Sequence, residues 1–260
     1  RPALDAKQAG FFQRTAEAVP AHGTWWSAEE TAEHVPEAVA PHGALRVRTG
    51  GALDVPAFCA RLIEVSGAEI VRGKMTEWST AGSGVRVSLA DGRELTTDRL
   101  LLAHGDGAAT HPALAGLSLH RILGETLRVR PPAGLKLEIP LSAGGYVVPT
   151  TEGHLLLGST YRHDFGEVVP SEEGRQAVLA KTTRILPALR DAEIIGHRAG
   201  VRVTVPNIRL PMAGPLPDQP NVWLFTALGS KGALMAPLIA QDLPGWLADV
   251  DRIPESLRVR

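Results

Sequence analysis

The chain has 260 residues and a mass of 27.6 kDa, and its formal net charge is −1, from 27 basic and 28 acidic residues. Hydrophobic residues make up 44% of the chain, an ordinary globular composition that excludes a disordered tail protein and a fibrous repeat. No apolar run approaches the ~18 residues that a membrane span needs, so no membrane association is predicted. The charge balance leaves no overall basic excess for nucleic-acid binding, although a local basic patch stays open.

Cys59 is the only cysteine of the chain. A single cysteine excludes an internal disulfide and a cysteine-based zinc cluster, and it is typical of a cytoplasmic protein. The nine histidines show no metal-ligand spacing, so no metal site is predicted. Ser159 and Ser230 have no base partner in the sequence, and no catalytic residue is assigned.

Predicted helices and short strands alternate in the first half of the chain. Helical spacing surrounds Phe11, Phe12 and Ala16, and Ser27 with Glu30 forms a capping-box pattern at the start of a second helix. A third helix extends from Asp54 to Gly67 and has an apolar face of Phe58, Leu62, Ile63 and Val65. Strands are predicted over residues 44–47, 68–71, 85–89, 94–96 and 99–103.

The second half is richer in predicted strands, which cover residues 120–129, 135–139, 146–149, 154–159, 194–205 and 221–226. Helices are predicted over residues 170–186 and 233–247, with Pro244 expected to interrupt the latter. Helix-plus-strand units alternating with antiparallel hairpins predict a mixed α/β (α+β) fold. In this fold an antiparallel-sheet domain is inserted into an α/β layer.

The most informative local pattern is a strand, then Gly229-Ser230-Lys231-Gly232, then a helix. Glycines at such a corner let the backbone approach a ligand, and the helix start presents unpaired N–H groups. The corner can hold a phosphate, a carboxylate or the electron-rich edge of a flavin. A tight strand-to-helix connection with no ligand is the alternative. Gly105 and Gly107, after a buried strand, form a weaker pattern that lacks the third glycine and the helix of a dinucleotide fingerprint.

Two further residues are candidates for substrate binding. Arg202 interrupts an apolar strand, so its guanidinium either faces water from an edge strand or binds an anion, because an unpaired buried charge is costly. Tyr146 begins a strand after Gly144-Gly145, and its alternative is a core aromatic with a hydrated hydroxyl.

The C-terminal third of the sequence carries a family resemblance. Its motifs are Gly200-Val201-Arg202, Arg209-Leu210-Pro211-Met212-Ala213-Gly214-Pro215-Leu216-Pro217-Asp218, Ala227-Leu228-Gly229-Ser230-Lys231-Gly232 and Ala236-Pro237-Leu238. With weaker matches upstream, the chain resembles the D-amino-acid-oxidase-type FAD-dependent oxidoreductases, the group of glycine oxidase and sarcosine oxidase. It is most similar to the FAD-dependent oxidase domain of the bifunctional tRNA enzyme for 5-methylaminomethyl-2-thiouridine.

The resemblance implies noncovalently bound FAD and oxidation of the C–N bond of a small amine or amino acid with a carboxylate, as in glycine or sarcosine. Arg202, Tyr146 and Lys231 match substrate-binding positions. The positions that match cofactor-binding residues are Met75, Ala103, Gly105, Gly214, Leu228, Gly229, Ser230, Lys231 and Gly232. Two alternatives stay open. The chain is a non-catalytic or truncated relative of this family, or it oxidises the side chain of a tRNA wobble uridine. The second alternative keeps tRNA open as a partner.

The resemblance also divides the chain into segments. Residues 1–48 and 118–206 match the antiparallel-sheet substrate domain, and residues 49–117 and 207–260 match the FAD-binding, Rossmann-like layer. The family's Gly-x-Gly-x-x-Gly unit has no counterpart in the sequence. We expect about a quarter of the family's length to be missing upstream of Arg1, which leaves FAD binding by this chain alone in question.

Overall fold

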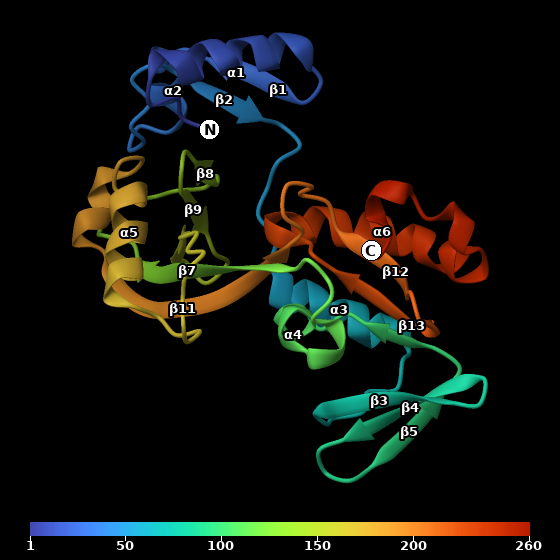
Figure 1. Cartoon of the computed structure of the whole chain (residues 1–260). Coiled ribbons are helices and arrows are strands. Elements are labelled where there is room, and N and C mark those ends of the chain that lie inside the picture. The colour runs from blue at the N-terminus through green and yellow to red at the C-terminus, as the bar shows by residue number, and fades with distance from the viewer. The chain divides into compact units, whose positions relative to one another are not determined.

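The structure is a computed structural model that describes residues 1–260 (Figure 1). The chain divides into two compact units, one of Arg1–Ala52 and Leu123–Gly200 and the other of Leu53–Ile122 and Val201–Arg260. The chain thus passes between units at residues 52/53, 122/123 and 200/201, whereas the predicted segments change at 48/49, 117/118 and 206/207.

The first unit begins with α1 (Ala6–Ala18), β1 (Gly23–Trp26), α2 (Ala28–His34) and β2 (Ala44–Val47). Strands β1 and β2 pair antiparallel. The predicted capping box of α2 is confirmed, because Glu30 N donates to Ser27 Oγ at 3.1 Å and Ser27 N donates to Glu30 Oε2 at 2.7 Å. Helix α1 buries Phe12 against Leu45 of β2 in a small core.

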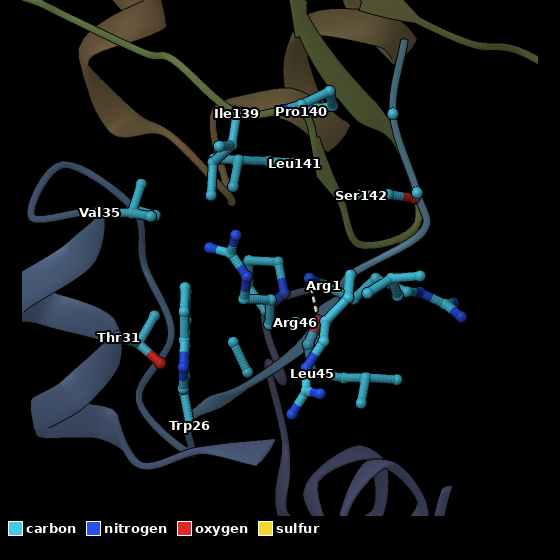
Figure 2. Close-up of a pocket in the computed structure, with 17 residues that line it drawn as sticks. Arg1, Trp26, Thr31, Val35, Leu45, Arg46, Ile139, Pro140, Leu141 and Ser142 are labelled. Carbon is cyan, nitrogen blue, oxygen red and sulfur yellow. Dashed lines mark hydrogen bonds between the residues drawn. The ribbon is translucent and has the colours of Figure 1, made fainter. Parts of the chain in front are cut away.

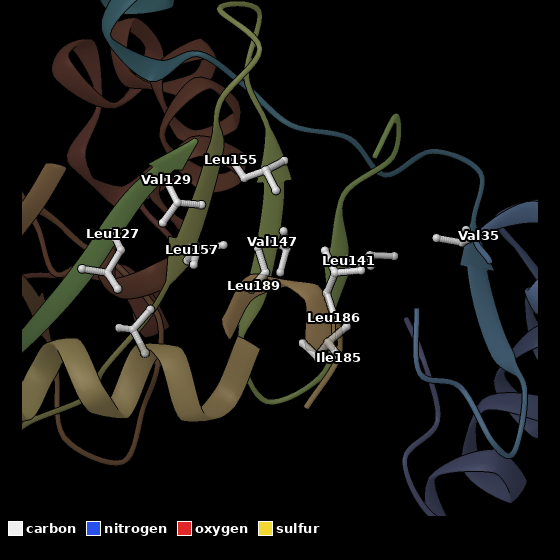
Figure 3. Close-up of a cluster of buried hydrophobic side chains, with 11 residues drawn as sticks. Val35, Leu127, Val129, Leu141, Val147, Leu155, Leu157, Ile185, Leu186 and Leu189 are labelled. Carbon is white, nitrogen blue, oxygen red and sulfur yellow. The ribbon is translucent and has the colours of Figure 1, made fainter. Parts of the chain in front are cut away.

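The rest of the first unit is a five-stranded sheet in the order β11-β7-β10-β9-β8. Its elements are β7 (His120–Arg130), β8 (Leu141–Ser142), β9 (Tyr146–Pro149), β10 (Leu155–Gly158), α5 (Glu172–Thr182), η2 (Pro187–Asp191) and β11 (Glu193–Thr204), of which β7 and β11 extend beyond the unit. Figure 3 shows the core, in which Leu127, Val147 and Leu157 are fully buried. Alternate strand residues therefore bury one face of this sheet.

The second unit holds two three-stranded sheets, β12-β13-β6 and β3-β4-β5. Its strands are β3 (Met75–Ala81), β4 (Gly84–Leu89), β5 (Glu94–Thr97), β6 (Leu100–Leu102), β12 (Met212–Leu216) and β13 (Gln219–Thr226). Its helices are α3 (Val55–Ser66), α4 (Asp106–Thr110), α6 (Gly232–Ala248) and the short η1 (Pro112–Leu114), η3 (Gly229–Lys231), η4 (Val250–Arg252) and η5 (Glu255–Leu257). Leu102 of β6 and Leu224 of β13 lie in its core.

The mixed α/β fold with antiparallel sheets is as predicted, but several elements differ. Residues 68–71 and 135–139 are not strands, and the polar strand β3 was not predicted. The apolar residues of 135–139 pack against the core of the first unit without pairing in its sheet. A short helix, α4, does follow Gly105.

One prediction about the helices also needs correction. Helix α6 continues through Pro244, because the carbonyl that proline leaves without a donor belongs to Ala240, which is exposed and can bond water. Helix α3 forms as predicted and ends at Gly67, with φ +64°, but it buries none of its residues. No helix combines the length and hydropathy that crossing a bilayer requires.

Candidate functional site

The candidate site lies where two parallel strands of the second unit end. Strand β13 pairs with β6 in parallel, and Val222, Trp223 and Leu224 lie opposite Leu100, Leu101 and Leu102. The carboxyl ends of both strands therefore meet at one edge of the sheet, and ligands of open α/β sheets bind beyond this edge. The loops that leave this edge contain most of the predicted cofactor-binding residues.

The loop after β6 offers accessible backbone. Ala103 and Gly105 are exposed, and a Cβ added at Gly105 would meet no atom within 4 Å. Gly105 has a φ of +58°, which favours glycine. The loop is anchored by Asp106, whose carboxylate accepts two hydrogen bonds from Arg121, at 2.6 and 2.7 Å. A ligand could thus approach a fixed backbone closely at Gly105.

The loop after β13 leads into the longest helix. Ala227 and Gly229 have φ values of 61° and 54°, and a Cβ at Gly229 would lie 2.9 Å from Thr204 Cγ2. Helix α6 begins at Gly232 with no side-chain cap and no acidic residue in its first turn. Its first N–H groups and the positive end of its dipole therefore favour an anionic or electron-rich ligand.

Two side chains near this edge have buried polar atoms without a hydrogen-bond partner within the chain. They are Thr226, whose Oγ1 is unpaired, and His104, both of whose ring nitrogens are unpaired. Each lies two positions beyond Leu224 or Leu102, the last residues paired between β13 and β6. Burial lowers the pKa of His104 below its ordinary value, and neighbouring His111 lowers it further, so the ring is neutral at pH 7. Buried polar groups are seldom left unpaired, so both invite an explanation.

The other predicted cofactor residues are more dispersed. Met75 lies in β3 and packs against the core that contains Leu102 and Leu224. Gly214, in β12, pairs with Leu224 of β13. Ser230 and Lys231 are exposed in the turn before α6.

The predicted substrate residues Tyr146 and Arg202 belong to different units. Tyr146 lies opposite Gly158, and a Cβ at Gly158 would come within 2.2 Å of Tyr146 Cζ, so the ring packs directly on the glycine. Arg202 is half-buried in β11, an edge strand of its sheet. Since the two residues lie in separate units, their joint action on one substrate stays a prediction.

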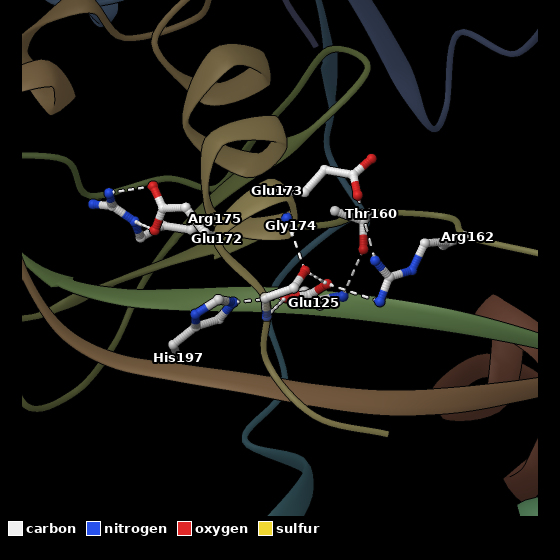
Figure 4. Close-up of polar contacts among 9 residues, drawn as sticks. Glu125, Thr160, Arg162, Glu172, Glu173, Gly174, Arg175 and His197 are labelled. Carbon is white, nitrogen blue, oxygen red and sulfur yellow. Dashed lines mark hydrogen bonds and ion pairs between the residues drawn. The ribbon is translucent and has the colours of Figure 1, made fainter. Parts of the chain in front are cut away.

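The structure also contains a buried polar network around Glu125 that the sequence analysis missed (Figure 4). Glu125 lies in β7 and is 1% exposed. Its carboxylate accepts hydrogen bonds from Ser171 N and Ser171 Oγ, both at 2.8 Å, and Nε2 of His197 lies 2.9 Å away. Arg162 lies 3.7 Å from the same carboxylate. Glu125 therefore connects β7 with β11 and with the start of α5.

Burial alone would raise the pKa of Glu125, but the hydrogen bonds from Ser171 and His197 hold it below its ordinary value. The carboxylate is therefore ionised at neutral pH. A signal was present in the sequence, because Glu125 lies two positions from both Leu123 and Leu127 and therefore falls on the apolar face of the predicted strand. His197 looked isolated in the sequence since its partner lies 72 residues away.

Comparison with known proteins identifies the family. Residues 2–244 match the family of FAD dependent oxidoreductases (DAO), and the chain belongs to this family. It is 30% identical to glycine oxidase from Pseudomonas aeruginosa over 184 residues, which cover 68% of this chain and 50% of that protein. It is 32% identical to the tRNA 5-methylaminomethyl-2-thiouridine biosynthesis bifunctional protein MnmC from Hahella chejuensis over 232 residues, which cover 81% of this chain and 37% of that protein.

The solved structures agree on the fold. Glycine oxidase from Geobacillus kaustophilus superposes with a TM-score of 0.82 at 22% identity, over 94% of this chain and 68% of that one. The chain spans half or less of the length of these two curated relatives. The family is FAD dependent, which confirms the predicted cofactor class.

Proposed function

We propose that this chain is the substrate-binding and flavin-facing part of an FAD-dependent oxidoreductase that oxidises the C–N bond of a small amine or amino acid bearing a carboxylate. Family membership supports the cofactor, and similarity to glycine oxidase supports the substrate class. The observation that carries the proposal is the edge where parallel β6 and β13 end beside the start of α6.

The residues at this edge fit FAD. The open backbone at Gly105 suits close contact with the cofactor, and the N-terminus of α6 suits its electron-rich ring or its phosphates. Leu228 to Gly232 would lie beside the flavin, while Ala103 and Gly105 would lie near its nucleotide half. When bound, FAD supplies the oxidising power for removal of a hydride from the carbon next to nitrogen.

In this proposal the protein side chains bind and orient the substrate. Arg202 would pair with the substrate carboxylate, since a guanidinium binds a carboxylate through two parallel hydrogen bonds. Tyr146, held against Gly158, would line the pocket, and Lys231 would add positive charge near the flavin. None of these roles needs a titrating catalytic group in the protein.

A glycine pair provides a matched test of the cofactor site. Gly229→Ala and Gly153→Ala both place a side chain at a positive φ, of 54° and 77° respectively. Gly153 lies in the β9–β10 hairpin with nothing near its added Cβ, whereas Gly229 lies at the proposed flavin corner. Backbone strain should cost each variant about 1 kcal/mol of unfolding free energy, and Gly229→Ala should lose more because its Cβ would lie 2.9 Å from Thr204 Cγ2. Only Gly229→Ala should weaken FAD binding, measured by quenching of flavin fluorescence.

The same titration tests the proposal itself. If the wild-type chain takes up no FAD, with no flavin absorbance and no FAD-dependent thermal shift, the holoenzyme proposal fails and the non-catalytic alternative is favoured. If FAD binds, oxidation of glycine and N-methylglycine is measured in the absence of oxygen as bleaching of the flavin absorbance. This measurement requires no assumption about the electron acceptor.

Similarity to the tRNA-modifying protein supports a second candidate, oxidation of a tRNA wobble-uridine side chain. The net charge of −1 gives this candidate no general electrostatic support. Bleaching by carboxymethylaminomethyl-uridine but not by N-methylglycine would favour it over the amino-acid proposal.

A further inference from the structure

The first unit contains a cavity that none of the predicted site residues lines. Its volume is about 310 Å³, within the range of small-molecule pockets. Figure 2 shows Trp26, Leu45 and Arg46 on one side and Ile139, Pro140 and Leu141 across from them. The cavity thus lies between β2 and the segment that precedes and enters β8.

Most of the cavity wall is apolar and belongs to packed structure. Val35, Leu45 and Leu141 line it and are only 5%, 4% and 3% exposed. Leu141 and Val35 belong to the main core of the unit, and Leu45 belongs to the small core beneath α1. A ligand with an apolar body would therefore meet a wall that is already in place, which lowers the cost of binding.

The charged groups of the wall all have one sign. Arg1, Arg46 and Arg48 line the cavity and no acidic residue does. None of the three guanidinium groups forms an ion pair with a carboxylate of the chain, whereas nine other arginines do. Arg48 donates to Thr24 Oγ1 at 2.9 Å, a neutral acceptor. The part of the cavity wall that these three arginines form therefore attracts an anion.

Arg46 packs over the ring of Trp26. Its guanidinium carbon lies 5.0 Å from the centre of the Trp26 ring, and the His34 ring lies 4.3 Å from the same ring. A guanidinium ordered by a cation–π contact loses less conformational freedom when it pairs with a carboxylate. Arg46 also lines an adjoining cavity of about 300 Å³ that contains Lys136 together with Glu37 and Glu138. The mixed charge of this adjoining cavity gives it no comparable preference for an anion.

We propose that the larger cavity is a binding site for a small amphipathic anion, with its apolar body against Leu45, Ile139 and Leu141 and its carboxylate on Arg46. The cavity shares no lining residue with the flavin corner, and its ligand binding does not depend on FAD.

The test uses 3-phenylpropionate and its neutral amide, 3-phenylpropanamide, as probes of the whole chain in calorimetric or ligand-observed NMR titrations. The carboxylate should bind about tenfold or more tightly than the amide, the difference expected for a charge-assisted pair. Arg46→Gln should reduce this preference to near unity, and Arg46→Lys should keep part of it. Ala38→Phe, which fills the cavity, should weaken both probes.

Arg86→Gln is the matched control, since Arg86 is a half-exposed arginine of β4 in the second unit. It should leave both affinities unchanged. Equal binding of acid and amide by the wild-type chain, or no binding of either, would overturn the proposal, as would an Arg86→Gln effect equal to that of Arg46→Gln. If Arg46→Gln does not fold, the wild-type comparison and Arg46→Lys still decide. An FAD titration of the same samples reports separately on the proposed oxidoreductase.

Discussion

Replacement of Glu125 should destabilise the chain more than replacement of any exposed carboxylate. In Glu125→Ala, Ser171 N, Ser171 Oγ and His197 Nε2 lose the acceptor they contact at 2.8–2.9 Å, and Arg162 loses a charge at 3.7 Å. Removing one partner of a buried charged network typically costs about 3–5 kcal/mol. Glu125→Gln fills the same space but loses the charge, and we expect a loss of about 2 kcal/mol from weaker hydrogen bonds.

The effect should depend on pH in a defined direction. Because hydrogen bonds lower the pKa of Glu125 in the folded chain, its ionised form stabilises the fold at pH values above the unfolded pKa. This contribution is lost as the pH falls through the lower, folded pKa. The stability difference between wild type and Glu125→Gln should therefore be constant near pH 7 and shrink once the pH falls below about 4.3.

Urea denaturation between pH 7 and pH 3 measures these differences. The control is Glu173→Gln, since Glu173 also faces Arg162, at 3.6 Å, but its side chain is 85% exposed. Exposed pairs contribute little, so this variant should match the wild type closely. Glu125 does not stabilise the fold as an ionised carboxylate if Glu125→Ala costs no more than Glu173→Gln, or if the stability difference for Glu125→Gln stays constant down to pH 3.

Three further predictions address other links in the structure. Thr226→Val should raise the unfolding free energy of the FAD-free chain by about 1 kcal/mol, because it removes a buried unpaired hydroxyl. If thermal denaturation shows that the variant is less stable than the wild type, the hydroxyl has a hydrogen-bond partner within the chain. Ser27→Ala should cost about 1 kcal/mol, measured with urea, by breaking the capping box of α2, and an unchanged midpoint would contradict this. Arg202→Ala should raise the KM for a carboxylate substrate about 10- to 100-fold in steady-state kinetics, and an unchanged KM would refute its proposed role.

Local signals predicted the local elements well. The capping box of Ser27 and Glu30 forms, and the Asp91-Gly92 turn joins β4 to β5 in an antiparallel pair. These features succeed because each depends on residues only a few positions apart, whose hydrogen bonds the sequence specifies directly. The short-range part of the fold was therefore accessible from the sequence.

Predictions failed where a pattern had more than one physical outcome. Leu135, Leu137 and Ile139 alternate with polar residues as a strand would, yet they pack on the core without joining the sheet. Strand β3 was missed because most of its residues are polar or exposed. In both cases the decisive factor is whether a neighbouring strand is available for hydrogen bonding, which periodicity does not report.

The candidate site shows the same limit at longer range. The sequence contains a glycine-bearing turn after residues 221–226 and another after residues 99–103. Each turn alone is consistent with a ligand site or with an ordinary connection that binds no ligand. The structure pairs Val222 with Leu100 in a parallel register, although 122 positions separate them. That long-range pairing brings the two turns to one edge, with the start of α6 beside them. A flavin site at this edge therefore depends on the pairing of β6 with β13, which neither glycine pattern could predict.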